Sequence, residues 1–181
     1  MRLVGQSWNI EKIKNNLKNK RNMAYYDKNQ GNGYRSQMGG SNFRGNNQNS
    51  EKETADGIFN KLEYQSSWIT QEPTEALVKY AETAGRFMAK NGLTNSKIRS
   101  IYGEIKRIQM GVFEREKPSF YLLKPKVAYA LGRDDKNEGL KLFKKIFDRC
   151  SADVSDQKSY QNFCGFIEAI LAYHKAYGGK D

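Results

Sequence analysis

The sequence has few of the residues from which small metal sites and disulfide-rich domains are built. Its 181 residues include only two cysteines, Cys150 and Cys164, and one histidine, His174. Because the two cysteines have no paired spacing, they favour neither a zinc site nor a disulfide framework. We expect both thiols to be reduced and buried.

Long apolar runs are also missing. No stretch approaches the roughly 20 apolar residues that a membrane-spanning helix requires. The N-terminal sequence MRLVGQSWNIEKIKNN lacks the continuous apolar segment of a secretory signal. We therefore expect a soluble, cytoplasmic protein with no membrane partner.

Acidic residues are too few to balance the basic ones. The chain has 31 lysines and arginines against 20 acidic residues, which gives a formal net charge of +11 and a pI of about 9.6. Such a charge favours anionic partners, with nucleic acid first and an anionic membrane surface second.

Residues 1–55 have few aliphatic side chains but hold 11 asparagines and 6 glycines. This composition cannot bury enough apolar surface to fold alone, so it predicts a disordered basic extension. Ile10, Ile13 and Leu17 have helical spacing among lysines, which predicts a short amphipathic helix that forms upon binding.

The same extension mixes aromatic residues with arginines, as in Tyr34-Arg35 and Phe43-Arg44. Flexible RNA-binding tails have this mixture, because rings stack on bases and guanidiniums pair with phosphates. A plain disordered leader is the alternative interpretation, and Met23 is an alternative start.

Residues 56–181 have a helical apolar period throughout and predict a single all-α bundle of about five to six helices. A linker that contains residues 114–117 should separate the third helix from the fourth, since Pro118 is expected to end helical structure. The predicted helices span residues 57–69, 74–91, 94–111, 124–133, 137–150 and 155–177.

Local signals set the ends and faces of these helices. Thr74 and Thr94 are expected to cap the helices that follow them, and Asn91-Gly92 to close the second helix in the left-handed conformation. The third helix should bury Ile98, Ile101, Tyr102, Ile105 and Ile108, and the fourth should pack through Val127, Ala128, Tyr129 and Leu131.

Catalytic groups are scarce. His174 lies on the aromatic face of the last helix, which favours a structural role over a general base. Asp134 and Asp135 could hold a metal, but adjacent carboxylates in a loop usually face solvent. Gly103 and Gly165 are interpreted as close-packing points. We expect no catalytic residue, no cofactor and no bound metal.

Basic residues are the abundant functional groups, and some recur with helical spacing. Arg99 and Lys106 are seven residues apart, with Gly103 between them leaving room for close approach, and Lys126 and Arg133 repeat this spacing on the next long helix. Two such rows could follow one phosphate backbone without reading base identity.

Three segments together resemble a known family. They are LVKYAETAGRFMAKNGLTNSKIRSIYGEIKRIQ at 77–109, LLKPKVAYALGR at 122–133 and YQNFCGFIEAILAYHKAYGG at 160–179. They are similar to the small α-helical subunit of type III-A CRISPR effector (Csm) complexes. The resemblance covers most of residues 75–179 and leaves the N-terminal extension uncovered.

The resemblance implies a non-catalytic subunit of an antiviral ribonucleoprotein. Members are helical bundles that stack in several copies along the guide RNA filament, beside backbone subunits and a large polymerase-like subunit, and contact the target RNA. The RNA-binding positions that it implies here are Lys97, Arg99, Lys106, Arg107, Lys126 and Arg133, with Lys141 and Lys144 as weaker candidates.

Two other interpretations are open at this point. One is a freestanding RNA-binding or annealing protein that acts through its basic tail. The other is a small metal-dependent nuclease centred on Asp134 and Asp135.

Overall fold

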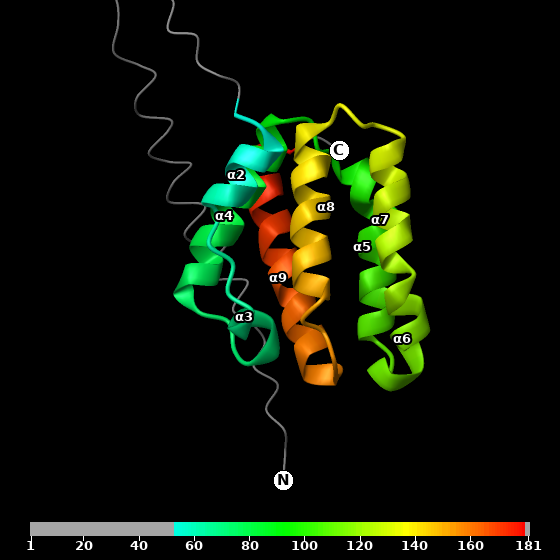
Figure 1. Cartoon of the computed structure of the whole chain (residues 1–181). Helices are drawn as coiled ribbons and strands as arrows, with labels where there is room; N and C mark the ends of the chain where they lie inside the picture. Colours follow the sequence, from blue (N-terminus) through cyan, green and yellow to red (C-terminus); the bar gives the residue numbers. More distant parts are fainter. Residues whose placement is uncertain (1–52, 180–181) are drawn as a thin grey trace, which may run out of the picture. The chain divides into compact units, whose positions relative to one another are not determined.

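In the computed structural model, residues 53–179 are described, and all regular structure within this range is α-helical (Figure 1). This confirms the predicted all-α class. The predictions made for residues 1–52 lie outside the described residues. The helices are α2 (Ala55–Lys61), α3 (Ser67–Thr70), α4 (Glu75–Lys90), α5 (Asn95–Gln109), α6 (Phe113–Tyr121), α7 (Leu123–Gly132), α8 (Glu138–Ser151) and α9 (Gln157–Ala176).

The last helix, α9, is the central packing element. It contacts α3, α4, α5, α6 and α8, and Figure 1 shows it in red and orange between α4 and α8. A capping box between Asp156 and Ser159 starts α9, and Gly178 follows its end with a positive φ of 84°. Its fully buried apolar residues include Tyr160, Phe163, Phe166, Ile167 and Ile170.

A glycine allows α4 to approach α9 closely. A Cβ atom at Gly85 would lie 2.6 Å from the carbonyl oxygen of Ile170 and 2.7 Å from the backbone nitrogen of His174. From the sequence, close packing was expected at Gly103 and Gly165 instead. That interpretation is wrong, because a Cβ atom at either position would meet nothing within 4 Å.

The predicted helix 57–69 is wrong, because this segment forms two helices, α2 and α3. Leu62 ends α2 in an extended conformation. Tyr64 then donates a hydrogen bond of 2.5 Å to Asp153, and its ring packs edge-on against Trp68 with centroids 5.8 Å apart. These tertiary contacts break a helical pattern that looked continuous in the sequence.

The predicted linker before the fourth helix is also wrong, because it forms helix α6 with Pro118 inside it. Phe113 and Phe120 lie on one face of α6 and are both buried. The Phe113 ring stacks on Tyr160 with centroids 4.8 Å apart. We attribute the helix to this aromatic contact, which outweighs the hydrogen bond that proline cannot donate.

Two predicted threonine caps have a different chemistry from that expected. Thr74 and Thr94 occupy the N-cap positions of α4 and α5, but neither side chain accepts a hydrogen bond from the helix backbone. Thr74 accepts one of 3.0 Å from the indole of Trp68, and the Thr94 hydroxyl lies 3.1 Å from that of Ser96. The left-handed residue after α4 is confirmed at Gly92, with φ of 88°.

The buried face of α5 is as predicted, whereas the buried face of α7 is not. The four isoleucines of α5 are buried, and Tyr102 is partly buried. On α7, Val127 is buried, but Ala128 is exposed and the Tyr129 side chain is 68% exposed. The prediction that Ala128 and Tyr129 pack inward is therefore wrong.

The cysteines and the histidine are interior groups. Cys150 and Cys164 are free and buried, and burial raises the pKa of both thiols, that of Cys164 to about 12. The imidazole Nε2 of His174 lies 2.8 Å from the carbonyl oxygen of Leu93. Its Nδ1 has no hydrogen-bond partner in the described part of the chain. Over residues 53–179, no helix has the length and apolar content needed to cross a membrane.

Candidate nucleic-acid interface

Helices α5 and α7, which carry the two predicted rows of basic residues, pack against each other and run antiparallel (Figure 1). Lys97 and Glu104 face α7, whereas Lys106 of the predicted row bonds to Glu168 of α9. Lys97, near the start of α5, pairs with Asp134, just beyond α7. At the other end, Lys126 near the start of α7 lies 3.7 Å from Glu104 in the second half of α5.

Two arginines in these rows have no carboxylate partner in the part of the chain that the structure describes. Arg99 and Arg133 are exposed, and within residues 53–179 neither forms an ion pair. The Arg133 guanidinium lies 5.9 Å from the ring centroid of Tyr129, one helical turn away. A free guanidinium presents planar donors that match the geometry of a phosphate group.

The other six predicted RNA-binding residues are paired with carboxylates. The pairs are Lys97 with Asp134, Lys106 with Glu168, Arg107 with Glu104 and Glu116, Lys126 with Glu104, Lys141 with Glu138 and Lys144 with Asp148. A phosphate that approaches one of these cations must compete with the carboxylate already there. The structure therefore separates residues that looked equivalent in the sequence.

Lys106 shows this difference clearly. Its ammonium donates to Glu168 of α9 at 2.5 Å and to Gln109 at 2.6 Å. Tyr102 donates to the same Glu168 oxygen at 3.0 Å, and burial raises the pKa of Tyr102 to about 12, so its hydroxyl stays a donor. Lys106 thus joins α5 to α9, whereas Arg99 on the same helix forms no ion pair within residues 53–179.

Several of the carboxylates in these pairs have a lowered pKa. Hydrogen bonds from Arg107 lower the pKa of both Glu104 and Glu116, and the hydrogen bond from Lys97 lowers the pKa of Asp134. These pairs persist at neutral pH, and exposed pairs of this kind are weak enough to exchange partners.

The acidic residues considered for a metal site lie in different environments. The Asp134 carboxylate is engaged by Lys97 and by the side-chain amide of Asn137 at 3.0 Å, while Asp135 is exposed. Among the described residues, no group of three His, Cys, Asp or Glu side chains is placed to hold a metal ion.

Lys141 lies apart from the α5–α7 surface. It bonds to Glu138 at 2.7 Å, and the other oxygen of Glu138 accepts the backbone N–H of Ala55 in α2 at 2.7 Å. This places Lys141 at the junction of α8 and α2. Lys144 bonds to Asp148 one turn further along α8, at 2.5 Å.

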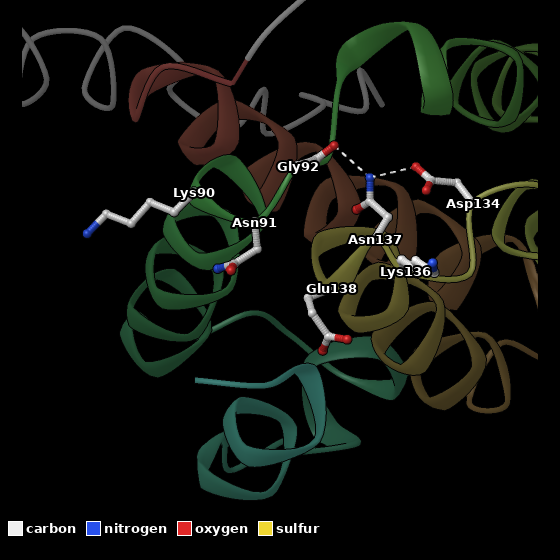
Figure 2. Close-up of a pocket in the computed structure, with 7 residues that line it drawn as sticks. All are labelled: Lys90, Asn91, Gly92, Asp134, Lys136, Asn137 and Glu138. Atoms are coloured by element: carbon white, nitrogen blue, oxygen red, sulfur yellow. Dashed lines mark hydrogen bonds between the residues drawn. The ribbon is translucent and has the colours of Figure 1, made fainter. Parts of the chain in front are cut away.

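A shallow polar pocket lies between the end of α4 and the start of α8 (Figure 2). The Asn137 amide donates to the carbonyl of Gly92 at 2.7 Å and to Asp134, so these groups satisfy one another. Lys90 and Lys136, at its edge, are exposed and have no ion pair among residues 53–179.

Sequence reasoning missed several exposed cations. Besides Lys90 and Lys136, they include Arg115 and Lys124, which also lack an ion pair in the part of the chain that the structure describes. Lys124 carried a usable signal, because no acidic residue lies within four positions of it in the sequence.

The comparisons with known proteins place this surface inside one matched region. The family model described as Csm2 Type III-A matches residues 71–180, which include α4 to α9 and every predicted RNA-binding position. No curated protein and no solved structure matches the chain.

Proposed function

The chain belongs to the Csm2 Type III-A family and is therefore a small subunit of a type III-A CRISPR effector complex, and we propose that it holds RNA there through sequence-independent contacts to phosphates. Target RNA, paired with the guide RNA, is the ligand. Sequence recognition is left to base pairing between the two strands.

One observation supports the proposed phosphate contacts most directly. Arg99 and Arg133 are exposed and lack ion pairs within residues 53–179, and they lie on two neighbouring antiparallel helices of a strongly basic chain. Guanidiniums bind phosphate oxygens in pairs and release condensed counterions when they do so. Such contacts position a strand without reading its bases.

The paired cations contribute less to RNA binding. Lys106, Arg107 and Lys126 reach phosphate only when it displaces Glu168, Glu104 or Glu116, so part of the electrostatic gain is lost. We therefore rank Arg99 and Arg133 above the other candidates.

The rest of the proposal concerns assembly. Several copies of the chain pack along the guide RNA filament beside the backbone subunits and the large polymerase-like subunit, in antiviral defence. The chain breaks no bonds itself and requires no cofactor.

The test compares RNA binding by the full chain and by the double variant Arg99→Gln/Arg133→Gln over a range of salt concentrations. Loss of each phosphate contact should reduce the slope of log affinity against log salt by about 0.7 for single-stranded RNA, and by about 0.9 for a duplex if the value for B-DNA applies. Lys90→Gln/Lys158→Gln is the matched control, because it removes two exposed cations that form no ion pair in the described range.

Equal losses of slope in the two double variants would show that only net charge matters, and the assignment to Arg99 and Arg133 would fail. Deletion of residues 1–52 separates the tail from the helical unit. Under the proposal, the truncated chain still binds RNA, and Arg99→Gln/Arg133→Gln still reduces its slope of log affinity against log salt. Complete loss of RNA binding would favour a protein that acts through its basic tail.

A further inference from the structure

Helix α7 has a solvent-facing surface that is apolar and aromatic. Leu122 and Tyr129, two turns apart on the same face, are 58% and 68% exposed, and the neighbouring Tyr121 is 63% exposed. Pro125 and Ala128 are exposed as well. Exposed apolar residues that are grouped in this way mark an interaction surface.

The segment that forms this surface carries only positive charges. From Lys117 to Arg133 the sequence has no aspartate or glutamate, but it has four basic residues, and Lys124 and Lys126 are both exposed. Carboxylates border the row on three sides: Glu104 of α5 lies 3.7 Å from Lys126, Glu114 bonds to Lys117 at 2.8 Å, and Asp134, which follows Arg133, pairs with Lys97. The charge complementarity therefore favours an anionic partner that also has apolar faces.

The arrangement of Tyr129 and Arg133 indicates which kind of anionic partner fits this surface. The guanidinium lies 5.9 Å from the ring centroid, one turn along α7, and both side chains are open to solvent. Aromatic rings and arginine planes that lie next to each other stack on nucleobases, while nearby cations contact the backbone. An RNA base has the flat apolar face and the attached negative charge that this surface would accept.

We propose that Tyr129 and Arg133 form a stacking platform for an unpaired RNA base, with Leu122 and Tyr121 extending its apolar surface. This site rests on the proposed RNA-binding function and adds to it a contact with the bases themselves. Because every base has a stacking face, the platform preserves binding that is independent of sequence.

The experiment compares two RNA probes that differ only in their bases. One is a short single-stranded oligoadenylate, and the other is an abasic ribose-phosphate oligomer of the same length. The full chain should bind oligoadenylate about 5- to 150-fold more tightly, the range that corresponds to roughly 1–3 kcal/mol for one stacked base.

The variants separate stacking from charge. Tyr129→Leu should reduce the ratio of the two affinities to near one and leave binding of the abasic oligomer unchanged, whereas Tyr129→Phe should keep the ratio. Arg133→Lys should lower the ratio while keeping the positive charge. Since Tyr129 is mostly exposed, each variant should keep the circular dichroism spectrum and unfolding midpoint of the wild type.

Each remaining outcome contradicts the platform. Equal affinity of the wild type for both probes, with a normal salt dependence, would reject stacking and leave the phosphate contacts intact. No binding of either probe would reject the proposed function as well. If Tyr129→Leu changed the oligomeric state but not the affinity ratio, the surface would instead be a contact between copies of the chain.

Discussion

A methyl group at Gly85 should force α4 and α9 apart. In Gly85→Ala, the new Cβ atom would lie 2.6 Å from the Ile170 carbonyl oxygen, and 2.7 Å from both the His174 nitrogen and the Tyr173 Cβ. Two of these three atoms belong to the backbone of α9, so they cannot rotate away. The helices must separate by several tenths of an ångström to reach ordinary van der Waals distances.

The change in the free energy of unfolding of Gly85→Ala is the sum of two opposing effects. Overpacking of this kind costs about 1–3 kcal/mol, and the rigid backbone contacts place this site near the upper end. Alanine gains back about 1 kcal/mol over glycine in a helix interior. We therefore expect Gly85→Ala to lower the free energy of unfolding by about 2 kcal/mol, which corresponds to roughly 6–10 °C in melting temperature.

Gly103→Ala is the matched control, because it is the same substitution inside α5 at a position where the Cβ atom would meet nothing within 4 Å. It should raise the free energy of unfolding by about 0.5–1 kcal/mol. Urea unfolding followed by circular dichroism measures both variants. Changes of the same sign in the two variants would refute the close approach of α4 to α9 at Gly85.

Three further predictions follow from the interior and the ion pairs. Asn137→Ala should destabilise the chain by about 1–2 kcal/mol in urea unfolding, because it removes the cap of α8; unchanged stability would contradict that role. Cys150 and Cys164 should react with a thiol reagent only after denaturation, and rapid labelling of the folded chain would disprove their burial. The hydrogen bond from Lys97 lowers the pKa of Asp134. The ionised Asp134 therefore stabilises the folded chain above the ordinary aspartate pKa, and this stabilisation is lost as the pH falls through the lowered pKa. Asp134→Asn should therefore make the unfolding midpoint less sensitive to acid, and an unchanged acid profile would count against the pair.

The long helices were predictable because their burial is periodic. The isoleucine stripe of α5 repeats at steps of three and four residues, and Asn137 and Gly92 gave correct ends. Such signals depend only on residues near one another in the chain, so one sequence contains them.

Contacts between distant residues caused the errors in the fold. The break after α2 depends on Tyr64 meeting Asp153, and α6 depends on Phe113 stacking on Tyr160. Local propensity argued against both features, and tertiary packing overrode it. Tyr129 was predicted to be buried, but it lies on a side of α7 that no other helix covers within the described residues. An aromatic residue in the sequence does not by itself show which side of a helix is covered.

The sequence supplied a set of candidate basic residues, but it did not show which of them have carboxylate partners. Spacing along α5 put Arg99 and Lys106 on one face, yet Lys106 meets Glu168, which lies 62 positions away in the sequence. Only the pairs at three or four positions, such as Arg107 with Glu104, could have been read from the chain.

RNA retention by the assembled effector complex tests the central claim most directly. The measurement compares complexes that contain wild-type subunit or Arg99→Gln/Arg133→Gln as salt concentration rises. Two lost phosphate contacts should reduce the slope of log affinity against log salt by about 1.4 to 1.8 for each copy of the subunit that contacts the RNA, while the variant still enters the complex. An unchanged slope with full incorporation would contradict the account.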